Sequence, residues 1–219
     1  MTYKRSALMQ SRIQQNKETI FAATKQLISE GGFKNAQITA IAEIAGVSNG
    51  LVYRYFKNKS QLMMDVLTEV SDTEIGILNS IADSDLPVDQ KLHKAVRVFV
   101  KRALNDPHMA YALMLEPVED AEFNQARIVV KANIAKPIER ILKQGKTEGV
   151  FLVNDIKIAA LCIVGAMTYS VIEPLNANNS ASQIFPSEVS LAISHENYRA
   201  YFSQEVADFC LTSARVLVH

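Results

Sequence analysis

Residues 38–60, with the sequence ITAIAEIAGVSNGLVYRYFKNKS, read as two short helices joined by a tight turn. Gly46 is placed to end the first helix, and Ser48 is placed to cap the second. Val52 and Phe56 lie four residues apart, so both point inward and leave the opposite face of the second helix free. This layout is typical of a helix-turn-helix unit that places its second helix in the major groove of DNA. The same periodicity also fits an ordinary three-helix bundle with tyrosines at its rim.

The charge of the chain is divided unequally along its length. The full sequence has 23 Lys and Arg and 23 Asp and Glu. The first 60 residues carry nine bases and three acids, a net charge of +6, and the other 159 residues carry −6. A basic N-terminal module attached to an acidic domain favours a polyanion as the N-terminal partner. An excess of six charges is also small enough to arise by chance.

Helical periodicity recurs along the rest of the chain, and strand signals are weak. The pattern predicts a first helix that ends at Gly31-Gly32, the two short helices above and a fourth helix that opens at residues 58–60. Further helices are predicted from Pro87, as a short helix between Pro107 and Pro117, over about 122–146 with a kink at Pro137, and over 155–173. A last helix is predicted to carry Tyr198 to Phe209, and residues 176–187 are predicted to form a loop. We therefore predict an all-α fold of about nine helices. Residues 1–58 form the helix-turn-helix bundle, with 1–10 as a flexible tail, and residues 59–219 form a larger helical domain.

Cysteine usage and hydropathy predict a soluble, cytoplasmic protein. The two cysteines, Cys162 and Cys210, both stand in apolar stretches, as buried thiols in a reducing compartment do. The N-terminus has no apolar signal-peptide core. The longest uncharged apolar run, residues 158–172, is shorter than the ~20 residues that a membrane span requires.

Over about residues 12–65 the chain resembles the TetR (TetR/AcrR) family of transcriptional regulators. The resemblance rests on the series AGVS-x-G-x-x-Y-x-Y-F…K, which runs from Ala45 to Lys59. Gly32-Phe33 at the end of the first helix, Ile41-Ala42 and Leu62 also match. The C-terminal region agrees with the family in length and helix count and carries no sharp motif.

The resemblance implies a surface that contacts base edges, adjacent backbone and phosphates of an operator. Its residues are Thr39, Ser48, Asn49, Gly50, Leu51, Tyr53, Arg54, Tyr55 and Lys59. Lys59→Ala is expected to weaken binding to every DNA sequence and to lower the salt dependence by roughly one unit. Two residues depart from the family pattern. Gln37 is a poor helix cap, and Leu51 cannot hydrogen-bond a phosphate.

The resemblance further implies a C-terminal domain that binds a small-molecule effector and forms a two-fold homodimer. The sequence supports a dimer independently, because the 155–173 helix is apolar around most of its circumference and must be covered on several sides. Candidate interface residues are Ala159, Gly165, Tyr198, Phe202, Val206 and Phe209. Complete burial within one chain is the alternative.

An apolar effector pocket is predicted between the middle helices. Its candidate lining residues are Phe99, Tyr111, Met114, Met167, Tyr169 and Ile172, and each of them also fits a plain core position. Candidate orienting polar groups are His93, Arg102, Glu116 and Arg127, which fit an exposed helical surface as well.

Enzyme, metal and cofactor hypotheses find no support in the sequence. None of the four histidines (His93, His108, His195, His219) has a partner at metal-ligand spacing, and no nucleophile signature occurs. The function expected is that of a DNA-binding regulator, most often a repressor in this family. It would bind a palindromic operator as a dimer and be released by a small apolar or amphipathic effector. The alternatives are a regulatory dimer that needs no effector, and an α-helical enzyme or lipid carrier.

Overall fold

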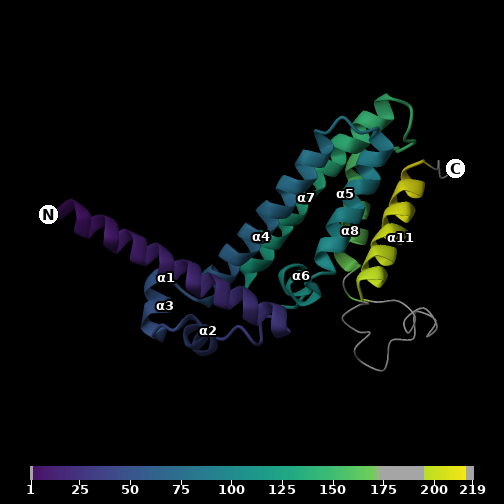
Figure 1. Ribbon diagram of the computed structural model, residues 1–219. Helices are drawn as coiled ribbons and strands as arrows, with labels where there is room; N and C mark the ends of the chain where they lie inside the picture. The colour runs from purple at the N-terminus through teal and green to yellow at the C-terminus, as the bar shows by residue number, and fades with distance from the viewer. Residues whose placement is uncertain (1, 171, 173–194, 216–219) are drawn as a thin grey trace, which may run out of the picture.

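The computed structural model describes residues 2–170, 172 and 195–215, which form nine α-helices and no strand (Figure 1). In chain order these are α1 (Thr2–Gly31), α2 (Ile38–Ala45), α3 (Asn49–Tyr55), α4 (Lys59–Ala82), α5 (Val88–Ala103), α6 (Pro107–Met114), α7 (Ala121–Thr147), α8 (Ile156–Tyr169) and α11 (His195–Arg215). The all-α prediction is confirmed. The predicted loop at 176–187 lies outside the described residues.

The N-terminal bundle packs α1, α2 and α3 around one apolar core. Local sequence sets the helix ends: Gly46 adopts a left-handed φ of 65°, and the adjacent N–H groups bond back to the last turn of α2. Gln37 precedes α2 and makes no side-chain capping bond, as expected of glutamine. The side chain of Gln37 donates instead to the carbonyl of Lys34, at 2.9 Å.

Two boundaries differ from the sequence expectation. Residues 2–10, expected to be a flexible tail, continue α1 toward its N-terminus, because no Gly or Pro interrupts the chain before Gly31. The domain boundary expected after residue 58 falls where α4 begins, yet Leu62 and Val66 of α4 are fully buried in the N-terminal core. The same core takes Leu113 from α6 and Phe123 from α7. No linker separates the two halves of the molecule.

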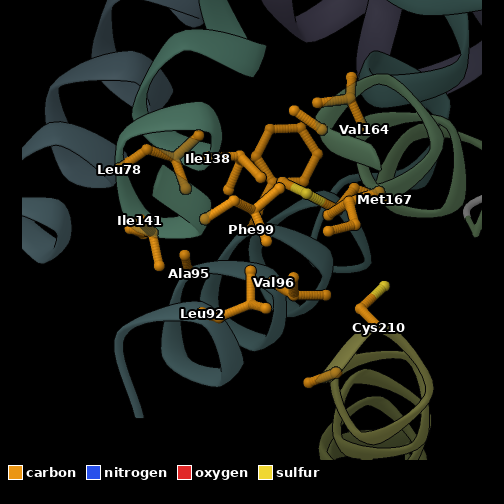
Figure 2. Packing of buried hydrophobic residues seen from close by; sticks show 14 of the residues in the cluster. Leu78, Leu92, Ala95, Val96, Phe99, Ile138, Ile141, Val164, Met167 and Cys210 are labelled. Atoms are coloured by element: carbon orange, nitrogen blue, oxygen red, sulfur yellow. The ribbon is translucent and has the colours of Figure 1, made fainter. Parts of the chain in front are cut away.

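The C-terminal domain is a bundle of α4, α5, α7, α8 and α11. The long helices α4 and α7 lie side by side, and α5 separates them from α11 at the far edge (Figure 1). α7 runs through Pro137 without ending there. Figure 2 shows Phe99, Ile138 and Met167 converging from α5, α7 and α8 on the centre of this core. None of the described helices is long and apolar enough to cross a membrane.

Candidate nucleic-acid interface and central cavity

The second helix of the helix-turn-helix unit, α3, is fixed at both ends and on one face. Ser48 caps it, its hydroxyl accepting a hydrogen bond from the backbone N–H of Leu51 at 3.2 Å. Val52 and Phe56 are buried against the bundle, as the sequence predicts. The remaining face of α3 is therefore held rigidly toward solvent, the arrangement that insertion into a major groove requires.

Most of the residues expected at a DNA surface lie on this outward side. Thr39, Ser48, Asn49, Gly50, Tyr53 and Arg54 are exposed, whereas Leu51 and Tyr55 are half-buried. The Tyr55 hydroxyl accepts a hydrogen bond from Asn16 at 3.3 Å, which ties α3 to α1. A Cβ added to Gly50 would meet no protein atom closer than 4.0 Å, so the protein's own packing does not require glycine there. Because Gly50 has no side chain, another molecule such as DNA can approach the backbone of α3 closely at this position.

Lys59 is oriented differently from the other candidates. Its ammonium donates a hydrogen bond to the carbonyl of Phe33 at 3.1 Å, which joins the start of α4 to the end of α1. Burial lowers the pKa of Lys59, and the nearby carboxylate of Glu116 partly opposes that effect. The charge of Lys59 is thus directed into the protein, and the exposed cation on α3 is Arg54.

We now expect Arg54 and Lys59 to give opposite results on substitution. Arg54→Ala should reduce the magnitude of the negative slope of log affinity against log salt by about 0.9, because one phosphate contact is lost. It should leave the melting temperature unchanged. Lys59→Ala should leave the slope within about 0.3 of wild type and lower the melting temperature, because a contact within the protein is lost. Fluorescence anisotropy at several salt concentrations and thermal unfolding measure both. If Lys59→Ala instead reduced the magnitude of the slope by about one unit, Lys59 would contact a phosphate, as expected from the sequence.

A cavity of about 410 Å³ lies where the N-terminal bundle meets the C-terminal domain. Phe99, Met114 and Met167, three of the expected pocket residues, line it. The side chain of Tyr169 is 61% exposed instead, because it lies on the outward face of α8. Tyr111 and Ile172 are half-buried and lie outside the cavity lining.

The cavity also has polar lining residues that sequence reasoning missed. α1 contributes Lys25, Gln26 and Ser29, and α4 contributes Ser71 and Glu74. Glu74 binds the guanidinium of Arg102 on α5 through oxygen–nitrogen distances of 2.8–3.0 Å, and this hydrogen bonding raises the pKa of Arg102. No local sequence signal marks these residues, because the cavity is assembled from helices that are distant in the sequence.

The other candidate orienting groups lie elsewhere. Arg127 is buried, and its guanidinium donates to the backbone carbonyls of Ala112, Leu113 and Glu116 at the end of α6. The Glu116 carboxylate accepts the N–H of Phe33 at 3.0 Å, across the junction with α1. His93 faces α11, where it contacts Gln204 and Asp208. No cluster of three His, Cys, Asp or Glu suited to a metal ion occurs among the residues described.

Comparisons with known proteins agree with the helix-turn-helix geometry. Residues 20–66 match the family "Bacterial regulatory proteins, tetR family". A fatty acid metabolism regulator protein of Bacillus subtilis is 24% identical over 154 residues, which cover 69% of this chain and 79% of the relative. The HTH-type transcriptional regulator HbdR of an Aromatoleum species is 34% identical over 82 residues, 37% of this chain and 36% of HbdR. The helix-turn-helix region of this chain therefore belongs to the TetR family.

Solved structures share the fold over most of the chain. The fatty acid degradation regulator FadR of Bacillus halodurans superimposes with a TM-score of 0.73 at 22% identity, over 92% of this chain and 97% of that one. FadR of Bacillus subtilis, solved in complex with stearoyl-CoA, gives 0.71 at 20% identity, over 89% and 97%. At these identities the likeness concerns the fold alone. The family match at the N-terminus and the curated relatives support a DNA-binding transcriptional regulator of the TetR type.

This chain also has an exposed apolar face on α8 and α11. Ile158, Leu161 and Phe209 are more than half exposed, and a groove of about 470 Å³ runs between the two helices. Of the expected interface residues, Phe209 and Ala159 border this groove. Phe202 and Val206 pack against the core of the chain instead, Tyr198 stacks on Phe202 with ring centroids 5.9 Å apart, and Gly165 is half-buried.

Proposed function

We propose that this protein binds a palindromic operator as a homodimer, represses transcription there and is released by a small apolar or amphipathic effector in the central cavity. The observation that carries the proposal is the position of the cavity, which touches both α1 of the DNA-binding bundle and the core of the C-terminal domain. A ligand at this junction has differential contacts with any two arrangements of the two halves, which is what a ligand must have to shift their equilibrium.

α6 is the element best placed to couple the two sites. Met109 and Leu113 line the cavity, and both also belong to the core that surrounds α1, α2 and α3. The end of α6 is joined through Arg127 and Glu116 to Phe33 at the end of α1. Gly32 at that point has a left-handed φ of 77°, and a Cβ there would lie 2.7 Å from Glu116. An effector that displaces α6 therefore also displaces the end of α1.

The exposed face of α8 and α11 supports the dimer. A second copy of the chain would cover Ile158, Leu161 and Phe209 across a two-fold axis, so that the same patch serves both protomers. Two recognition helices related by such an axis would meet DNA about one helical turn apart. The effector-independent alternative requires a closed C-terminal core, and a cavity of about 410 Å³ counts against it.

Selection from a random pool of DNA duplexes by the purified full-length protein tests this proposal. The expected product is an inverted repeat with half-site centres about 10 base pairs, or a multiple of that, apart. Enrichment of a single half-site would contradict the dimeric mode. The absence of any enriched sequence at physiological salt would instead favour the carrier alternative.

A further inference from the structure

The hydroxyl of Ser71 is the feature of the cavity that the proposed mechanism leaves unused. Ser71 is 1% exposed, lines the cavity from α4, and its oxygen has no hydrogen-bond partner among the described residues. The other buried hydroxyls described, those of Thr24, Thr168 and Ser203, each donate to a backbone carbonyl of the preceding turn. A buried hydroxyl without a partner is unfavourable, because the group gives up its bonds to water and gains none.

The charged groups around the cavity are balanced. Lys25 and Arg102 supply two positive charges, and Glu74 and Asp106 supply two negative ones. Each is already bonded within the protein: Lys25 to Glu69 at 3.1 Å, Arg102 to Glu74, and Asp106 to the hydroxyl of Ser29 at 2.5 Å. A carboxylate or phosphate entering this site would find no uncompensated cation, and its loss of hydration would not be repaid.

The rest of the lining is apolar and adaptable. Phe99, Leu113 and Ile134 are buried side chains, and Met109, Met114 and Met167 are flexible thioethers. Solvent does not reach the Ser71 oxygen in the structure, so a ligand must displace a neighbouring side chain to bond to it. Methionine rotamers can adjust in that way at little cost.

We propose that the effector is an uncharged, mainly apolar molecule with one oxygen acceptor, of the ester, ketone or alcohol type, which accepts a hydrogen bond from Ser71. This inference rests on the proposed function, because it assigns the ligand class of the same cavity. Ser71 then determines specificity, and the apolar part of the ligand packs against the methionines. Ser71 and Glu74 lie one turn apart on the same face of α4, so the Glu74–Arg102 pair adjoins the polar end of the ligand.

Methyl decanoate and decanoate at pH 8 are the probes, because they share a chain and differ in charge. Calorimetry or a thermal shift on the full-length protein without DNA should show the ester binding at least tenfold more tightly. Ser71→Ala should weaken binding of the ester about tenfold, the value of one well-formed hydrogen bond. The same variant should melt no lower than wild type without ligand, because alanine removes an unpaired buried hydroxyl and favours helix. Ser80→Ala, an exposed serine on the same helix, is the control and should match wild type.

Glu74→Gln provides a second, independent readout. It removes the charge that neutralises Arg102, so it should raise the affinity for decanoate at least fivefold and leave that for the ester unchanged. Equal binding of both probes to wild type, wild-type affinity of Ser71→Ala for the ester, or no binding of either probe would overturn the inference. None of these results depends on DNA binding, which the duplex selection tests separately.

Discussion

Replacing Arg127 by methionine is expected to lower the free energy of unfolding by about 3 kcal/mol. The guanidinium donates to Leu113 and Glu116 at 2.7 Å each, and to Ala112. The carbonyls of Ala112 and Leu113 belong to the last turn of α6, which provides no intrahelical partner for them. Each buried carbonyl left without a donor costs about 1–3 kcal/mol, whereas methionine retains most of the apolar packing of the side chain. Chemical denaturation followed by circular dichroism measures the loss.

Arg140→Met provides the matched control on the same helix. Arg140 bonds to Asn79 and Asp83 at the surface, where ion pairs contribute about 0–1 kcal/mol. The control should therefore unfold within about 1 kcal/mol of wild type. An Arg127→Met protein as stable as the control would mean that the end of α6 does not depend on the guanidinium.

The loss of stability in Arg127→Met should be largest at the junction of the N-terminal bundle and the C-terminal domain. The guanidinium also lies over the rings of Phe123 and Phe33, 4.6 Å and 5.9 Å from their centroids. Phe33 and Phe123 pack edge to face at 5.2 Å, so the same residue supports both α6 and the end of α1. We expect hydrogen exchange to rise first in α6 and residues 31–36.

The DNA-binding end was predictable because its determinants are local. The Ser48 cap, the Gly46 turn and the four-residue spacing of Val52 and Phe56 each act within one turn of helix. The junction was not predictable from such signals. Arg127 reads as an ordinary surface residue of a long helix, and only the fold brings it under the carbonyls of α6. Lys59 also matches the family motif, yet the carbonyl of Phe33, 26 residues earlier, determines where its charge points.

The cavity and the apolar face illustrate a second limit of the sequence. The sequence shows that α8 is apolar on more than one side, and periodicity alone does not tell which of these sides meets the core. The structure buries Ala160, Ile163 and Met167 and exposes Leu161 and Tyr169. Tyr169 therefore belongs to the outer surface and not to the pocket for which it was a candidate.

Leu161→Asp is expected to convert the proposed dimer to a monomer at micromolar concentration. Leu161 is 61% exposed on α8, and its neighbours in the helix Ile158 and Cys162 line the groove shared with α11. Because a two-fold interface uses each residue twice, the variant loses two buried leucines, roughly 3–6 kcal/mol, and brings in two carboxylates that a dry interface cannot solvate. Sedimentation velocity measures the change. Ile128→Asp is the control, because Ile128 is equally exposed on α7, and it should leave the wild-type assembly intact.

The same substitution should reduce operator affinity at least hundredfold, since a monomer engages one half-site and loses the gain of binding both together.

Thiol labelling gives an independent readout of the interface. Cys162 borders the groove and is exposed in the single chain, whereas burial raises the pKa of Cys210 to about 11. Cys162 should react slowly in the wild-type dimer and quickly in Leu161→Asp, with Cys210 unreactive in both. A wild-type protein that sediments as a monomer, or a Leu161→Asp protein that remains dimeric with Cys162 protected, would exclude this face as the interface. The recognition helices would then require another means of spanning two half-sites.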